Sequence, residues 1–180
     1  MLRHSSLCLA IVALIAFPQP MSVRAASKAP EKCVAVFEFE LIDSSLEGEI
    51  KGIDSAEQQR LGLLGEQLRT WLAAHGRRTV CDMSAVAAEA KAANLYACGC
   101  IQRLASSAGG ELAVVGAVHK VSNLILNITV DVFDVETGKR LIQLNADIRS
   151  NSDRSWTRGL DWLIKHRLAG VLASVEGSKL

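Results

Sequence analysis

Apolar and polar positions follow each other along this chain with strand and helix periods. Residues 34–41 are first apolar on both faces and then alternate, which predicts a strand inside a sheet that helices cover. Residues 43–52 are rich in Ser, Gly and acids, so we expect a loop there. In residues 54–76 leucines recur at three- and four-residue intervals, which predicts a helix capped by Asp54 or Ser55.

The pattern continues as a strand, two helices, three strands and a last helix. The first of the two helices is rich in Ala, which buries little area, so we expect it at the periphery. The ranges are a strand at 77–83, helices at 84–94 and 101–108, strands at 112–121, 124–133 and 139–149, and a helix that Asp153 caps and that ends near Gly170.

The strand at 124–133 alternates most cleanly, so its two faces can be assigned. We expect one face in the core and the other at least partly wet. Two parallel crossovers followed by an antiparallel meander predict an α/β fold, a mixed sheet of about five strands with helices packed on it. The core face holds Leu124, Leu126, Ile128, Val130 and Val132, and the wet face holds Asn127, Thr129 and Asp131.

The first 25 residues have the order of a signal peptide. Arg3 and His4 precede an apolar run at 7–17, and small residues lead up to Ala26. Cys8 lies before most of the apolar run, so it does not fit a lipid attachment site. We therefore expect residues 1–25 to be cleaved and residues 26–180 to form a single domain in the periplasm or outside the cell.

The charge balance argues against nucleic acid as a partner. The leader carries two of the 20 basic residues and none of the 19 acidic ones, so its removal changes the net charge from +1 to −1. A nucleic-acid or anionic-lipid surface needs a basic excess. Beyond Ala26, no apolar run is long enough to cross a membrane.

Four cysteines follow the leader: Cys33, Cys81, Cys98 and Cys100. An even number in an exported chain predicts disulfides, and three pairings are open. A bond between Cys98 and Cys100 would close a small, strained ring, and strain makes a disulfide easier to reduce. The favoured alternative is structural, in which Cys98 or Cys100 staples the start of a helix to Cys33 or Cys81.

Recognised catalytic patterns are missing from the sequence. It has no Gly-rich phosphate loop, no nucleophile-elbow pattern and no paired histidines at zinc spacing. The three histidines after the leader, His75, His119 and His166, are scattered. We therefore name no catalytic residue, metal ligand or cofactor.

Two polar stretches allow two interpretations. In the structural one, Asn and Ser make turns, Asp153 caps a helix and the tryptophans pack in the core. In the other, loops present adaptable polar and aromatic side chains to a partner. The candidate binding residues are Lys120, Ser122 and Asn123 in the first stretch and Arg149, Asn151, Asp153, Trp156 and Arg158 in the second.

Residues 116–127, 134–139 and 147–160 carry a resemblance to known proteins. They resemble a family of uncharacterised bacterial secreted proteins, a domain of unknown function, so the resemblance implies no activity. Members of that family carry cysteines just before the helix that leads into the third predicted strand, where this chain has Cys98 and Cys100.

More distantly, residues 34–39 and the order of elements are similar to the amino-terminal domain of the Tol-Pal translocation protein and to related envelope lipoprotein domains. Those domains bind other envelope proteins and do no chemistry. The resemblance implies a non-enzymatic periplasmic module that binds a protein or assists an envelope or periplasmic system. A second hypothesis is a thiol-disulfide protein that uses Cys98 and Cys100.

Overall fold

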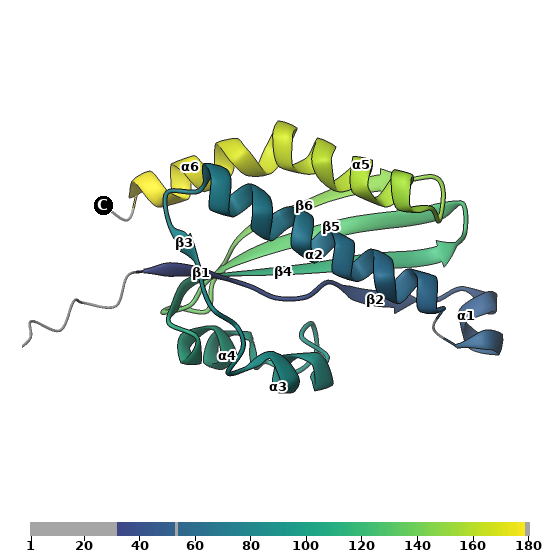
Figure 1. The fold of residues 1–180 in the computed structure, drawn as a ribbon, viewed down its shortest axis with the longest axis horizontal. Helices are drawn as coiled ribbons and strands as arrows, with labels where there is room; N and C mark the ends of the chain where they lie inside the picture. Colours follow the sequence, from purple (N-terminus) through teal and green to yellow (C-terminus); the bar gives the residue numbers. More distant parts are fainter. Residues whose placement is uncertain (1–31, 53, 179–180) are drawn as a thin grey trace, which may run out of the picture.

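A computed structural model describes residues 32–52 and 54–178. They form three layers, with one mixed sheet between two layers of helices. The leader predicted at residues 1–25, with Cys8, lies outside the described residues, as do residues 26–31. Helices cover the sheet on both sides, as Figure 1 shows. None of the helices in the described ranges combines the length and apolarity needed to cross a bilayer.

The sheet runs in the order β3-β1-β4-β5-β6, with β2 beside β4 along the same edge as β1. β1 is parallel to both β3 and β4, and β4, β5 and β6 form an antiparallel meander. The two parallel crossovers and the meander confirm the predicted fold class. The strands are β1 (Cys33–Val36), β2 (Glu40–Asp43), β3 (Thr79–Val80), β4 (Gly110–Ser122), β5 (Ile125–Asp134) and β6 (Arg140–Ile148).

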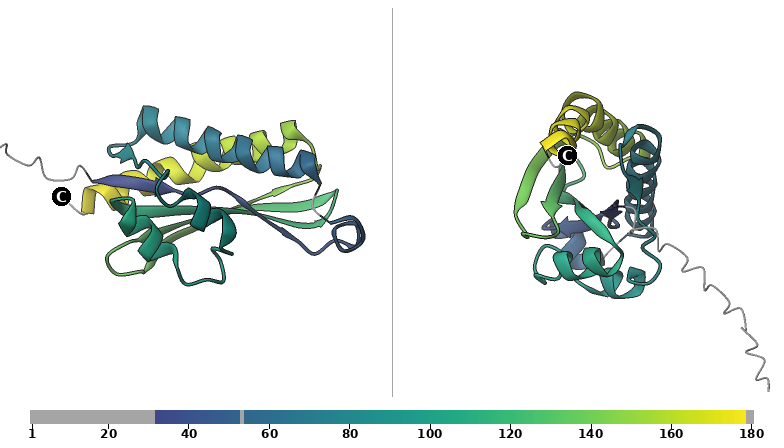
Figure 2. Two further views of the ribbon diagram at one scale, coloured as in Figure 1. Left: turned by 60° about the horizontal axis from the view of Figure 1, so that its bottom comes forward. Right: turned by 90° about the vertical axis from the view of Figure 1, so that its left-hand side faces the viewer.

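One face of the sheet is covered by the long helices and the other by the short ones (Figure 2). The first face holds the larger apolar core, with the leucines of α2 against Val114 and Ile128. Leu104 and Val115 belong to the smaller core beneath. The helices are α1 (Leu46–Lys51), α2 (Ser55–His75), α3 (Ala87–Ala92), α4 (Ile101–Ser107), α5 (Asp153–Leu163) and α6 (Ala169–Ser178), with a π-helical turn, Ile164–Leu168, between the last two.

The strand expected at 34–41 is broken in the middle. Phe37 belongs to the core under α3 and α4, whereas Phe39 belongs to the core under α2. Residues two apart in a regular strand share a face, so the backbone shifts phase between these two. β1 and β2 therefore pair with β4 as two separate strands.

Several predicted boundaries are wrong. The expected loop at 43–52 contains α1, which Ser45 caps by accepting a bond from the backbone N–H of Gly48. The helix expected to end near Gly170 continues to Ser178 through the π-helical turn. The predicted strand at 77–83 pairs only at Thr79–Val80.

The core face of β5 is predicted correctly except at its first residue. Leu126, Ile128, Val130 and Val132 are buried as predicted, but Leu124 lies in the turn before the strand and is 70% exposed. The face expected to be at least partly wet is half-buried at Asn127 but covered at Thr129 and Asp131, and Asp131 is fully buried. Burial raises the pKa of Asp131, while Tyr96 and Arg140 act to lower it.

Leu126→Ala should lower the free energy of unfolding by about 2–5 kcal/mol, because it removes a buried side chain from the core. Leu124→Ala, two residues away and exposed, should change it by less than about 0.5 kcal/mol. Urea titration of both variants measures the difference. Equal losses would contradict the burial pattern of this strand.

Candidate functional site

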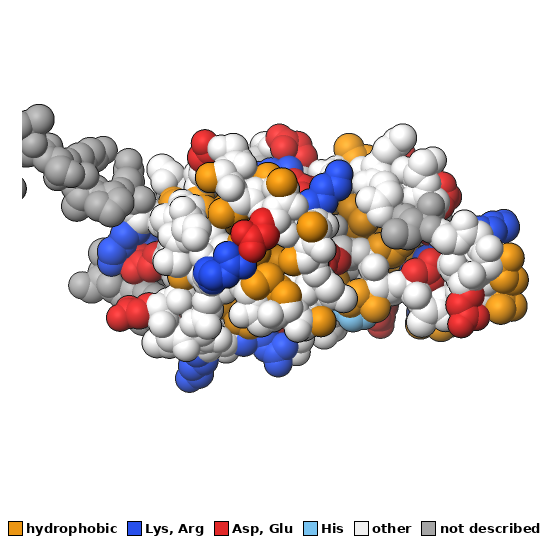
Figure 3. Space-filling model, turned by 90° about the horizontal axis from the view of Figure 1, so that it is seen from below, with side chains coloured by type: hydrophobic (Ala, Val, Ile, Leu, Met, Phe, Trp, Pro, Cys, Tyr) orange, Lys and Arg blue, Asp and Glu red, His pale blue; other side chains and the backbone are white. Residues whose placement is uncertain are grey.

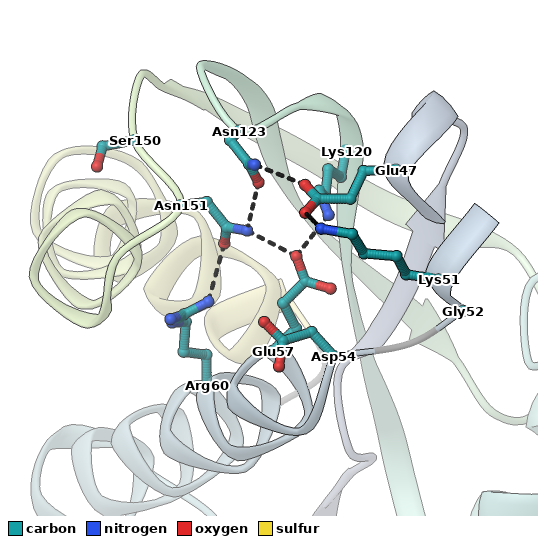
Figure 4. Close-up of a pocket in the computed structure, with 10 residues that line it drawn as sticks. All are labelled: Glu47, Lys51, Gly52, Asp54, Glu57, Arg60, Lys120, Asn123, Ser150 and Asn151. Carbon is teal, nitrogen blue, oxygen red and sulfur yellow. Dashed lines mark hydrogen bonds and ion pairs between the residues drawn. The ribbon is translucent and has the colours of Figure 1, made fainter. Parts of the chain in front are cut away.

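A polar hollow of about 590 Å³ opens at the end of the molecule where β2 and β4 finish. Four separate segments build it: α1, the start of α2, the β4–β5 turn and the loop between β6 and α5 (Figure 4). We call this site the polar hollow. Its lining residues are Glu47, Lys51, Gly52, Asp54, Glu57, Arg60, Lys120, Asn123, Ser150 and Asn151.

A buried ion cluster forms the floor of the polar hollow. The Nζ of Lys120 lies 2.6 Å from Oε1 of Glu57 and 3.1 Å from Oδ2 of Asp43. Lys120 is 2% exposed and Glu57 1% exposed, so both charges are removed from water. Such a pair is tolerated only when the partners satisfy each other, which ties β2, β4 and the first turn of α2 together.

Two opposing effects set the pKa values of this cluster: burial disfavours the charged forms, and pairing favours them. Burial by itself would lower the pKa of Lys120, but its bonds to Glu57 and Asp43 outweigh burial and raise it. Burial would raise the pKa of Asp43, but bonds from Ser45 and the charge of Lys120 bring it below its ordinary value. Lys120 therefore stays a cation and Asp43 an anion at neutral pH.

Two asparagines connect the loops above this floor. The amide of Asn151 donates to Oε1 of Glu57 at 2.6 Å and to Oδ1 of Asn123 at 2.9 Å. Asn123 in turn donates to Glu47 on α1 at 2.6 Å. The backbone N–H of Asn151 also donates to the carbonyl of Asn123 at 3.0 Å, which holds the two loops side by side.

Arg60 closes the α5 side of the polar hollow. Its Nη1 donates to Oδ1 of Asn151 at 3.0 Å, and its Nε lies 2.7 Å from Oδ1 of Asp153. The guanidinium also lies 5.8 Å from the centre of the Trp156 ring, within the range of a cation–π contact. This arginine therefore fixes the start of α2 to the start of α5.

Exposed apolar side chains lie on two of the segments that line the polar hollow, α1 and the β4–β5 turn. Two are on α1, beside the lining residues Glu47 and Lys51, and three flank Asn123 around the β4–β5 turn. We call this set the apolar rim and the whole region the end surface. The apolar rim is Leu46, Ile50, Val121, Leu124 and Ile125, between 57% and 74% exposed.

Residues 32–168 match a protein family described as "Protein of unknown function (DUF2380)", named DUF3280. The chain belongs to this family. The match covers the sheet and every residue that lines the polar hollow. It confirms the resemblance to a domain of unknown function and brings no activity with it. The search of curated proteins finds no match.

Solved structures similar to this DUF3280 protein share little sequence with it. LpoB of E. coli is 11% identical, with a TM-score of 0.47, over 80% of this chain and 84% of LpoB. The hypothetical protein CT253 of Chlamydia trachomatis is 15% identical, with a TM-score of 0.47, over 80% and 99%. TolB of Acinetobacter baumannii is 17% identical, with a TM-score of 0.45, over 80% of this chain but 30% of TolB.

The structure brings together only part of the predicted binding surface. Asn123 and Asn151 line the polar hollow, and Asp153 reaches it through Arg60. Lys120 lines it as well, but from a buried position. The side chain of Ser122 accepts a bond from the backbone of Leu124 within the turn.

Two further predictions need correction, and the one for Arg149 and Arg158 stays a prediction. Trp156 is fully buried in the core, so it cannot contact a partner. Ser152, and not Asp153, caps α5, because the Ser152 hydroxyl accepts from the N–H of Ser155. Arg149 and Arg158 are exposed but do not line the polar hollow.

Sequence reasoning missed Glu57, Arg60 and Glu47. Asp54 accepts a bond from the N–H of Ala56 and caps α2, as predicted, and an acid three residues after a cap is ordinary helix-start chemistry. Nothing in that spacing shows that Glu57 pairs with a lysine 63 residues later. Within residues 32–52 and 54–178, no group of three His, Cys, Asp or Glu side chains is arranged to hold a metal ion.

All four described cysteines form disulfides, Cys33 with Cys81 and Cys98 with Cys100. The expected staple from the helix start to Cys33 or Cys81 is therefore wrong. Cys33 is the first residue of β1, and Cys81 directly follows β3. These two strands pair with each other, which brings the two cysteines together. Cys98 lies in the exposed turn before α4, on the same side of the sheet but in a separate segment.

Proposed function

We propose that this DUF3280 protein is a non-enzymatic protein-binding module of the periplasm or of the secreted fraction, formed by residues 26–180 after removal of residues 1–25. The end surface is the contact region. Its partner is a periplasmic or envelope protein, for which the module acts as an accessory. Residues 1–31 lie outside the described part of the chain, so export rests on the sequence pattern.

The apolar rim is the observation that carries this proposal. Monomeric proteins rarely gather several large exposed apolar side chains in one place, because each one leaves apolar area in water. Here five of them lie on two segments that line a polar hollow, and a contact region commonly combines apolar area with hydrogen bonding in this way. Burying the apolar rim against a partner would supply the driving force.

The chemistry of the polar hollow supports recognition. Glu47 is tied to Lys51 and Asn123, and Glu57 is tied to Lys120 and Asn151, so the charges of these pairs neutralise each other. The bonds from Lys51 and Asn123 lower the pKa of Glu47, which keeps it ionised and makes it a poor general acid. A preformed network of this kind positions donors and acceptors at low entropic cost, which suits specific binding.

The proposal is tested by recovering the partner from periplasmic extract with purified mature protein. A variant carrying Leu46→Ser and Leu124→Ser should recover at least about tenfold less partner than wild type, since it loses two apolar side chains of the rim. Trp162→Ser is the matched control, because Trp162 is 47% exposed on α5, outside the end surface. Equal recovery by the double variant and wild type would refute the end surface as the contact region.

A second function is favoured by one observation, the exposed Cys98–Cys100 disulfide. In thiol-disulfide exchange, a partner thiolate would attack one exposed sulfur, form a mixed disulfide and release the other cysteine as a thiolate. Access is the first requirement of this chemistry. Cys98 meets it, whereas Cys33 and Cys81 are 8% and 7% exposed.

We expect Cys98 and Cys100 to be reduced and alkylated at lower concentrations of reductant than Cys33 and Cys81, because the reductant reaches only the first pair without local unfolding. Mass mapping after graded reduction measures the order. Release of Cys33 and Cys81 first would exclude the redox function. It would leave both disulfides as structural cross-links.

A further inference from the structure

β2 is an edge strand of the sheet, as β3 and β6 are. β2 pairs with β4 and with no other strand in the described part of the chain. The backbone N–H of Ser44 donates to the carbonyl of Lys120 in β4 at 2.9 Å. Backbone groups of successive residues in a strand point to opposite sides, so those of Leu41 and Asp43 face away from β4. A strand edge of this kind is a template for another extended chain.

A groove of about 950 Å³ lies along this edge, between α2 on one side and α3 on the other. Its floor is the segment 36–42, and its walls come from α2 and from residues 81–95. Figure 3 shows apolar side chains in the hollowed stretch between α3 and the α1 end of the molecule. The edge of β2 is thus recessed between two helices.

Gly62 on α2 indicates that the groove is kept open. A glycine inside a helix costs about 1 kcal/mol relative to alanine, so it usually has a packing reason. At Gly65, one turn later, a Cβ would lie 2.8 Å from the Glu38 carboxylate, so neighbouring atoms occupy the space beside it. A Cβ on Gly62 would meet no described atom within 4 Å, although Gly62 lines the groove. The room beside it is used by nothing in the described fold.

We propose that this groove receives an extended segment of another protein, which adds to β2 as a further strand. Main-chain hydrogen bonds to Leu41 would hold the segment, and the small residues Gly62 and Ala87 on the two walls leave space for its alternating side chains. The site is separate from the polar hollow, so the inference goes beyond the end surface.

The shape and charge of the groove decide the kind of occupant. Pairing of β2 with the β2 of a second copy is hindered, because each edge is recessed between its own helices. A single extended segment fits. Arg69 pairs with Glu38 at 2.8 Å, and the remaining acids along the groove, Glu40 and Asp82, outnumber the remaining base, Lys91. The groove therefore suits a segment that carries a basic residue among apolar ones.

The probe is a phage-displayed library of random peptides of about twelve residues, enough for a strand and its flanks. It is selected against the purified mature protein with both disulfides intact. We expect enriched peptides with alternating apolar residues and a Lys or Arg. Hydrogen exchange should show that a selected peptide protects the backbone amides of Leu41 and Asp43, which face away from β4.

Two variants of α2 make the test specific. Gly62→Gln places a larger side chain in the groove, should leave the melting temperature equal or higher, and should weaken peptide binding at least about tenfold. Leu63→Gln is the matched control, because Leu63 is 48% exposed and does not line the groove. Failure to enrich any peptide, or equal binding by the Gly62→Gln variant, overturns the proposal. So does dimerisation of wild type that Gly62→Gln abolishes.

Discussion

Lys120→Met should lower the free energy of unfolding by about 3–5 kcal/mol at neutral pH, the usual cost of breaking a buried ion pair from one side. Lys120 and Glu57 are almost completely buried and lie 2.6 Å apart. Without the lysine, the Glu57 carboxylate remains in the interior with only Asn151 to bind it. Chemical denaturation at pH 7 measures the loss.

The double variant Lys120→Met with Glu57→Gln is the control for this interpretation. The glutamine amide would be neutral and its oxygen could keep the bond from Asn151, so most of the lost stability should return. A single variant that loses less than about 1 kcal/mol would mean that water reaches the cluster. A double variant as unstable as the single one would mean that the cause is packing or the Asp43 carboxylate, which also loses Lys120, and not the Glu57 charge.

The same cluster gives a pH dependence with a definite sign. The pKa of Asp43 is lowered from its ordinary 3.8, so its contribution is present above that value and is lost as the pH falls through the folded-state pKa. The pKa of Lys120 is raised from 10.5, so its contribution is present below that value and is lost as the pH rises through the folded-state pKa. The cluster therefore stabilises the fold across the whole neutral range.

Trp156→Ala should lower the free energy of unfolding by about 3–5 kcal/mol, because it empties a site in the centre of the larger core. Trp162→Ala, on the same helix but 47% exposed and beside the ring of His166, should cost far less. Thermal or urea unfolding of the two variants provides the comparison. A folded, stable Trp156→Ala protein that fails only in partner binding would restore Trp156 to the binding surface.

The fold could be predicted wherever the buried residues of an element recur at the spacing of a helix or a strand. The leucines of α2 and the alternation of β5 from Leu126 to Val132 face one core, so their positions carry the signal directly. The break between β1 and β2 carries no such signal. Phe37 and Phe39 are both apolar and both buried, and only the structure shows that they enter different cores. The covered face of β5 was missed for a similar reason, because Thr129 and Asp131 look like solvent-facing residues.

The polar stretches were recognised, but their chemistry was divided wrongly between surface and interior. Asn123 and Asn151 do meet at the end of the sheet, as side chains from two loops of one meander can. Trp156 faces the core because its position on α5 is set by the apolar period of that helix. Pairing of Lys120 with Glu57 depends on where α2 begins relative to β4, which is a tertiary relation and leaves no local pattern.

The claim that a partner docks on the end surface is tested most directly by photo-crosslinking in living cells. Leu124 and, separately, Trp162 are replaced by a photo-reactive phenylalanine analogue, since both are exposed but only Leu124 belongs to the apolar rim. We expect a protein adduct of one defined mass after illumination with the analogue at position 124, and none with it at position 162. An adduct at position 162 together with none at position 124 would contradict the claim.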